Sequence, residues 1–176
     1  PSYNGARKLP NLTALLALLL AQDEVAVLVH GPATEPGRVT TAEIFRDLGL
    51  PIATDAAGVE QAWARREPVF VATASLCPPL ARLLDVRRVI GVRNPGHTVA
   101  KLLDPTRDGS ALRVVNYTHP EYAKAQAEFL QHSRANALLA NPRITRPSPS
   151  FNSRGDAGLP GVPSVSANVN AVWRGP

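Results

Sequence analysis

The chain has 176 residues and 44% hydrophobic residues, which suits one α/β domain with a sizeable core and excludes a wholly disordered protein. Its one cysteine, Cys77, excludes an intrachain disulfide and favours a reducing, cytoplasmic location. The longest apolar run, residues 12–21, is shorter than the ~20 residues that a membrane-spanning helix needs, so we expect no membrane partner.

The net charge of +5 is spread unevenly along the chain. Residues 141–176 hold four arginines and one aspartate, and therefore carry +3 of this charge. Overall charge is thus weak evidence for a nucleic-acid partner. A cluster of cations on the folded part would be stronger evidence.

Apolar runs and capping residues predict strands that alternate with helices. The runs VAVLVH and VFVAT are typical of buried strands in a parallel sheet. Asn11 is expected to cap a helix of leucine and alanine that is buried on most sides, and Thr40 or Thr41 to cap a helix that Gly49 ends. Thr118 is expected to cap the last helix. The expected strands are 25–30, 51–54, 69–73 and 112–117, with 89–92 as a short strand or extended link, and the expected helices are 12–22, 41–48, 59–66, 78–84, 97–103 and 120–131.

This alternation predicts an α/β fold with a mostly parallel central sheet and helices on both faces, over residues 1–140. Residues 141–176 are rich in proline, glycine and serine and are expected to form a poorly ordered tail. The chain begins with Pro1 and contains no methionine, so we expect a fragment of a longer protein, incomplete at both ends.

Several segments resemble the phosphoribosyltransferase domain of the anthranilate phosphoribosyltransferase family. They are SYNGARKLPNLT at 2–13, VLVHG at 27–31 followed by DLG at 47–49, and DVRRVIGVRNPGHTVAKLLDP at 85–105. SYNGAR, the GVRN–H–KLL segment and YTHPEY at 117–122 resemble in particular the YbiB-type, DNA-binding branch of that family. The resemblance implies the family's α/β fold and a homodimer of the full-length protein, formed through an N-terminal helical domain.

The resemblance also locates departures from the enzymes of the family. Their GTGGD loop would lie before residue 1. Their KHGNR loop corresponds to 29–33, where Val29, Pro32 and Ala33 replace lysine, asparagine and arginine. A histidine of their acceptor site corresponds to Cys77, and no acidic pair that could hold magnesium follows Glu128. The positions that match the enzymes are Asn11, Thr13, His30, Gly31 and Arg87, the last corresponding to an arginine for the anthranilate carboxylate.

These departures matter because phosphoribosyl pyrophosphate carries several negative charges. Its site needs cations, hydroxyls and backbone amides in place of water. Loss of the loop cations and the presence of Glu35 remove much of that stabilisation, and Mg²⁺ prefers oxygen ligands that are missing here. We therefore assign no catalytic residue, no metal ligand and no cofactor.

Candidate residues for phosphate or nucleic-acid binding follow from the basic segments and from the retained family positions. For the basic segments, the plainer interpretation is a solvated surface with local ion pairs, and for His30 it is a structural role. Spacing four residues apart would align Arg93, His97 and Lys101 on one helix face, although Pro95 and Gly96 oppose a helix there. The candidates are Arg7, Lys8, Asn11, Thr13, His30, Gly31, Arg38, Arg87, Arg88, Arg93, His97 and Lys101.

The sequence thus favours a catalytically impaired glycosyltransferase-like domain that binds nucleic acid through phosphate contacts, without strong sequence preference. One alternative is an active transferase that moves ribose 5-phosphate from phosphoribosyl pyrophosphate, with Mg²⁺, to an anthranilate-like amine or base. Another is a fragment without function.

Overall fold

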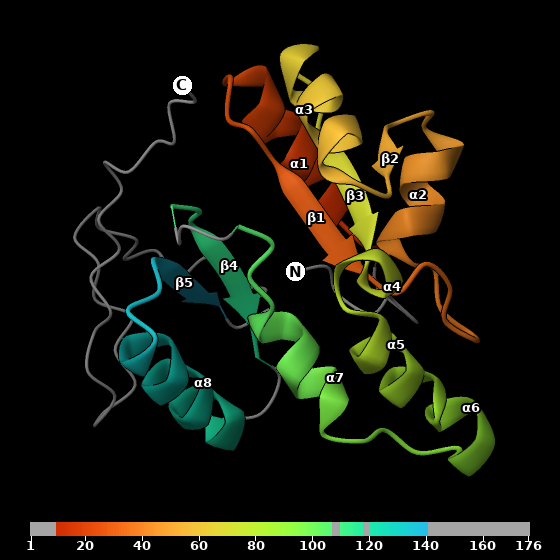
Figure 1. Ribbon diagram of the computed structural model, residues 1–176, viewed down its shortest axis with the longest axis vertical. Coiled ribbons are helices and arrows are strands. Elements are labelled where there is room, and N and C mark those ends of the chain that lie inside the picture. Colours follow the sequence, from red (N-terminus) through yellow and green to blue (C-terminus); the bar gives the residue numbers. More distant parts are fainter. Residues whose placement is uncertain (1–9, 107–109, 118–119, 141–176) are drawn as a thin grey trace. The chain divides into compact units, whose positions relative to one another are not determined.

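The computed structural model describes residues 10–106, 110–117 and 120–140 (Figure 1). The chain divides into two compact units, Pro1–Pro105 and Thr106–Pro176. This division falls inside the expected domain 1–140, so the expected boundary between domain and tail stays a prediction. The tail, Arg7, Lys8 and the predicted cap Thr118 lie outside the described residues.

The first unit is built on three parallel strands in the order β1–β3–β2. Phe70 of β3 lies opposite Val29 of β1 and opposite Ile52 of β2, so β3 is the central strand. A helix connects each strand to the next, as parallel pairing requires. The elements are α1 (Thr13–Gln22), β1 (Leu28–Gly31), α2 (Thr41–Asp47), β2 (Ile52–Ala53), α3 (Ala56–Ala64) and β3 (Val69–Ala72).

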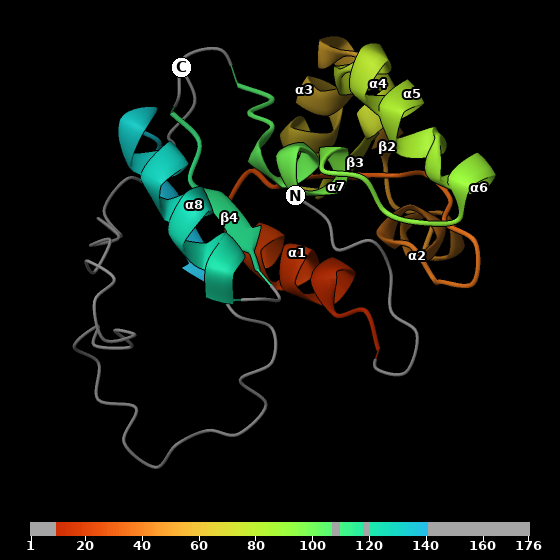
Figure 2. The ribbon, with the colours of Figure 1, turned by 90° about the horizontal axis from the view of Figure 1, so that it is seen from below.

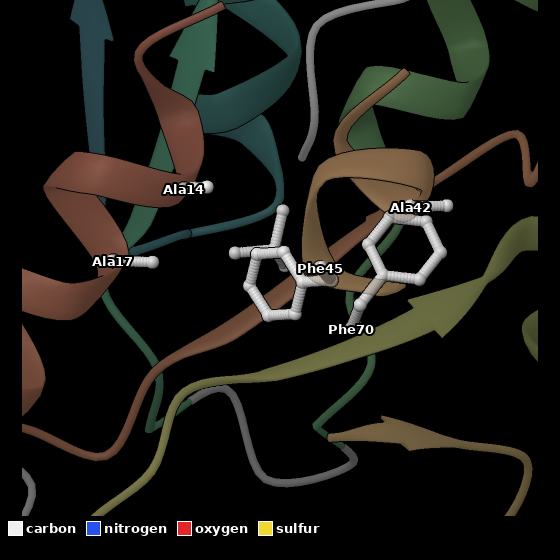
Figure 3. Packing of buried hydrophobic residues seen from close by; sticks show 6 residues of the cluster. Ala14, Ala17, Ala42, Phe45 and Phe70 are labelled. Carbon is white, nitrogen blue, oxygen red and sulfur yellow. The ribbon is translucent and has the colours of Figure 1, made fainter. Parts of the chain in front are cut away.

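Helices cover both faces of this sheet because side chains of β3 alternate between the faces. On one side Phe70 packs against Phe45 of α2, whose ring faces Ala14 and Ala17 of α1 in the same cluster (Figure 3). Val69 and Val71 pack on the other side against Ala62 of α3. The Phe45 and Phe70 rings lie 5.9 Å apart, inclined at 56°. The predicted α/β class with parallel strands is confirmed.

Helix α1 is correctly placed, but the prediction that it is buried on most sides is wrong. Ala14, Ala17 and Ala21 face the core and are at most 5% exposed, whereas Leu15, Leu16 and Leu19 are 50–52% exposed. Alanine lets the helix approach the sheet closely, so the bulkier leucines are left on the opposite side. Composition alone does not reveal this, because both faces are apolar.

Helix α2 begins as predicted. The Thr40 hydroxyl accepts a hydrogen bond from the Glu43 amide (3.2 Å), and the Glu43 carboxylate accepts one from the Thr40 amide (2.7 Å). Such a capping box satisfies donors that the first turn leaves free. Gly49 follows the helix with a φ of 68°, a conformation that glycine adopts without strain.

Beyond β3 the first unit continues in short helices, which lie past the arrowheads of β1 and β3 in Figure 1. Pro78 occupies the first turn of α5, as predicted. The expectation of an extended segment at 89–92 is wrong, because residues 87–90 form a helical turn that Gly91 ends with a φ of 74°. These elements are α4 (Thr73–Leu76), α5 (Pro78–Asp85), α6 (Arg87–Ile90), α7 (Gly96–Val99) and the 3-10 helix η1 (Ala100–Leu102).

The second unit is a β-α-β unit of β4 (Arg113–Asn116), α8 (Pro120–His132) and β5 (Ala137–Ala140). The two strands are parallel, with Val115 opposite Leu139. Ala123, Ala127 and Leu130 form the buried face of α8. The sequence did not indicate β5, because ALLA is built from residues that favour helices. No helix in the described ranges has the length and apolarity needed to cross a membrane.

Phe45 provides a test of this core. Replacing it with alanine should lower the free energy of unfolding by about 3–5 kcal/mol, because the side chain is fully buried against Phe70. Urea denaturation followed by circular dichroism measures the change. Leu48→Ala, at an exposed position after the same helix, should change it by less than ~0.5 kcal/mol.

If Phe45→Ala does not fold, Phe45→Leu should still show a loss, of about 1 kcal/mol. Equal stabilities of the leucine variant, the alanine variant and the unmodified chain would contradict the packing.

Candidate functional site

The carboxyl ends of β1 and β3 meet at one edge of the first unit's sheet. His30 and Gly31 end β1, and Thr73 directly follows β3. The helices α1 and α2 begin at this edge. There the side-chain amide nitrogen of Asn11 donates a hydrogen bond to the Thr41 hydroxyl (3.0 Å), and the side-chain oxygen of Asn11 accepts one from the backbone amide of Thr13 (3.2 Å). Four of the predicted residues, Asn11, Thr13, His30 and Gly31, are therefore brought to one place.

His30 is only 3% exposed. Burial disfavours the charged imidazolium and lowers the pKa of His30 from 6.5 to about 3, so the ring is neutral near pH 7. Nδ1 of His30 and the Thr73 hydroxyl are buried without a hydrogen-bond partner among the described residues. Buried polar atoms without partners are uncommon, so this edge has capacity to bind a polar ligand.

A second group of predicted residues gathers around His97. We call Arg38, Arg87, Arg93, His97 and Lys101 the cationic cluster. His97 is 8% exposed, and burial lowers its pKa. The three guanidinium groups lower the pKa further, whereas a hydrogen bond with the Asn94 carbonyl raises it.

The pKa of Lys101 is lowered by the same two causes, burial and a neighbouring arginine. Burial lowers the pKa of Lys101, and the charge of Arg93 lowers it further. Arg93 therefore acts on both His97 and Lys101, although the chain from 93 to 101 is not one continuous helix. The charge of Arg93 thus reaches both titratable side chains of the cluster.

Asn94 holds the segment that carries His97. Its amide donates to the Leu83 carbonyl (2.6 Å) and its side-chain oxygen accepts from the Gly96 amide (2.9 Å). The Asn94 main-chain carbonyl lies 3.2 Å from Nδ1 of His97, which must carry the proton to donate there. A Cβ on Gly96 would lie 2.8 Å from Oδ1 of Asn94 and 3.0 Å from the Leu83 side chain, so a larger residue would force these side chains to shift.

The loop between β1 and α2 joins this region, and Figure 2 shows it passing beside α6. Arg87 forms an ion pair with Glu35 of the loop, and both side chains are largely buried. Arg88 forms an exposed ion pair with Asp85 (3.1 Å) and donates to the Thr34 hydroxyl (3.2 Å). Two of the predicted phosphate-binding arginines, Arg87 and Arg88, thus have carboxylate partners in the protein.

Thr34, Thr73 and Asn94 were not among the residues expected at the site, and Glu35 was expected only as an unfavourable charge. The available signal for Asn94 was its position before Pro95 and Gly96, a combination that is typical of turns. No signal links Glu35 to Arg87, because the pair depends on tertiary contact. Within the described ranges, no three histidine, cysteine, aspartate or glutamate side chains are grouped so that they could hold a metal ion.

The buried state of His30 predicts acid sensitivity. Below pH 6.5 the unfolded chain binds a proton at His30, whereas the folded chain does not until the pH approaches 3. The free energy of unfolding is therefore fully retained above pH 6.5 and falls as the pH drops from 6.5 toward 3. His30 should therefore make the free energy of unfolding about 2 kcal/mol lower at pH 5 than at pH 7. Urea denaturation at both pH values should show that His30→Leu removes this difference.

The control is His132→Leu, at an exposed position, which should retain the difference between the two pH values. Equal pH dependence of the free energy of unfolding in the two variants would contradict the burial of His30.

No family model matches the chain. Over 139 residues the chain is 42% identical to the protein YbiB of Escherichia coli (strain K12), an alignment that covers 79% of the chain and 43% of YbiB. It is 28% identical over 100 residues to the anthranilate phosphoribosyltransferase of Prochlorococcus marinus (strain NATL1A), which covers 57% of the chain and 29% of that enzyme. It is 27% identical over 133 residues to the anthranilate phosphoribosyltransferase of Thermus thermophilus, which covers 76% of the chain and 40% of that enzyme.

The chain therefore spans less than half of the length of these relatives. The similarity to the enzymes and the higher identity to YbiB agree with the resemblance of the sequence motifs. The chain belongs to the anthranilate phosphoribosyltransferase-like family, close to YbiB.

Proposed function

We propose that the cationic cluster binds the phosphate groups of nucleic acid and that the domain does so without catalysing phosphoribosyl transfer. The observation that carries the proposal is that Arg38, Arg87 and Arg93 lie close enough to the buried His97 to lower its pKa, and that Arg93 does the same to Lys101. Burial is the main cause of the lowered pKa of His97 and of Lys101, and the charges of neighbouring arginines lower both values further. A phosphate oxygen placed there would relieve this repulsion and accept charge-assisted hydrogen bonds.

The loss of transferase chemistry is supported by the residues at the sheet edge. The position of the enzymes' loop lysine is Val29, whose side chain is buried in the core with Ala14 and Phe70. This position supplies no cation to the edge. Pro32 has no backbone N–H to donate to a phosphate, and Glu35 adds a negative charge.

Contacts of this kind position a nucleic-acid backbone but do not distinguish bases. We therefore propose binding without strong sequence preference. The homodimer of the full-length protein and the cytoplasmic location stay predictions for the protein as a whole.

Binding through phosphates has a direct test in its salt dependence. Fluorescence anisotropy with a labelled 20-base-pair DNA should give an affinity that falls steeply between low and moderate salt, with a slope of roughly −0.9 for each phosphate contacted. Arg93→Gln should weaken binding several-fold and reduce the slope by about one. Arg46→Gln removes the same charge from an exposed position on α2, outside the cluster, and should have a much smaller effect.

Repeating the titration with unrelated DNA sequences and with RNA of the same length tests the expected sequence tolerance and identifies the preferred nucleic acid. A flat salt dependence, or no binding at low salt, would overturn the proposal.

A second candidate function is phosphoribosyl transfer, and one observation favours it. The buried Nδ1 of His30 and the Thr73 hydroxyl lack partners among the described residues at the carboxyl edge of a parallel sheet, which is where α/β folds bind ligands. Magnesium would need ligands from elsewhere, since the described part of the chain offers no suitable group of side chains.

Isothermal titration with phosphoribosyl pyrophosphate and Mg²⁺ distinguishes the two functions. We expect no micromolar binding, because Val29, Pro32 and Ala33 leave the pyrophosphate without its cations. Micromolar binding that Thr73→Val weakens would instead favour the transferase, and it would place the sugar phosphate at this edge.

A further inference from the structure

We propose that Glu35 is an internal competitor for the cationic cluster: its carboxylate occupies the phosphate-binding position at Arg87, and the loop between β1 and α2 must move before a nucleic-acid phosphate can take that position. The inference rests on the proposed function, because it describes how the same cluster is regulated. The contact that carries it is the Arg87–Glu35 ion pair.

Burial distinguishes this ion pair from others in the described residues. The side chains of Arg87 and Glu35 are 18% and 10% exposed. The pairs Arg65–Glu67, Arg66–Glu24 and Arg88–Asp85 leave each side chain at least 41% exposed. Exposed pairs contribute little because water and salt screen them, whereas a buried pair is strongly coupled. Glu35 is thus held at Arg87 far more firmly than a surface carboxylate would be.

The loop is attached to α6 at two adjacent points. Glu35 pairs with Arg87, and the preceding Thr34 accepts a hydrogen bond from Arg88 (3.2 Å). Consecutive loop residues therefore contact consecutive arginines. Within the loop, the Arg38 amide donates to the Glu35 carbonyl (3.2 Å) and the Thr40 hydroxyl to the Ala33 carbonyl (3.1 Å), so the Glu35 side chain must leave Arg87 without support from a freely moving backbone.

The chemistry of the two anions makes them competitors. Carboxylate and phosphate oxygens accept the same charge-assisted hydrogen bonds from a guanidinium group. While Glu35 is bound, it neutralises one of the three arginines around His97, although the remaining field still lowers the pKa of His97. An entering phosphodiester must therefore displace a carboxylate that is already paired, and this weakens its binding.

Glu35→Gln tests the competition, because the amide keeps the size of the side chain but removes its charge. In the anisotropy assay we expect Glu35→Gln to bind the 20-base-pair DNA about 5- to 10-fold more tightly than the unmodified chain, with a salt slope steeper by about one. Glu24→Gln is the matched control, because Glu24 also pairs with an arginine, Arg66, but at an exposed position. It should change the affinity by less than twofold.

Arg87 loses its buried partner in Glu35→Gln, so the variant should also be less stable, and DNA should raise its melting temperature more than that of the unmodified chain. Should Glu35→Gln fail to fold, Thr34→Ala removes only the exposed contact to Arg88 and should raise the affinity by about twofold.

The outcomes separate this inference from the proposed function. If the unmodified chain and Glu24→Gln bind DNA with a clear salt dependence, while neither Glu35→Gln nor Thr34→Ala binds more tightly, then Glu35 is a structural partner of Arg87 and the competition does not exist. If no variant binds DNA at low salt, the proposed function fails and the inference fails with it.

Discussion

Pairing of β3 with β1 on one side and β2 on the other fixes where the loops of the first unit leave the sheet. Because all three strands are parallel, the segment after Gly31 of β1 and the segment after Ala72 of β3 leave the sheet at the same edge. The alternating side chains of β3 attach helices to both faces, through Phe70 on one side and Val69 and Val71 on the other. The candidate residues are therefore positioned by a core to which they contribute little.

Two kinds of polar environment result at and beyond this edge. At the strand ends, His30 is buried and neutral, and hydrogen bonding rather than charge is what the site can offer. Around His97, burial and the neighbouring arginines lower the pKa of His97 and of Lys101, and Glu35 pairs with one of these arginines, Arg87.

Much of the fold could be predicted from the sequence, because local signals were strong. The apolar runs around Val29 and Val71 are strands, and Thr40 caps α2 through Glu43, as its position indicated. Predictions failed where local pattern does not decide the outcome. Composition could not show which face of α1 is buried, and the apolar run after Arg88 forms a helical turn instead of an extended segment.

The candidate site was predictable to a similar extent. The basic segment from Arg87 to Lys101 and the sheet-edge residues could be named, because the family motifs mark them. The ion pair between Arg87 and Glu35 could not, because these residues are far apart in the chain and only the folded loop brings them together. The contribution of Arg38 to the field at His97 depends on the same loop.

The close packing around Gly96 has a consequence for sequence divergence. Every replacement of this glycine adds a Cβ, which would collide with the Asn94 side chain and through it disturb the turn that holds His97. Replacements of residue 96 should therefore be rarer in lineages that retain the cluster than replacements of the exposed Val92 and Val99.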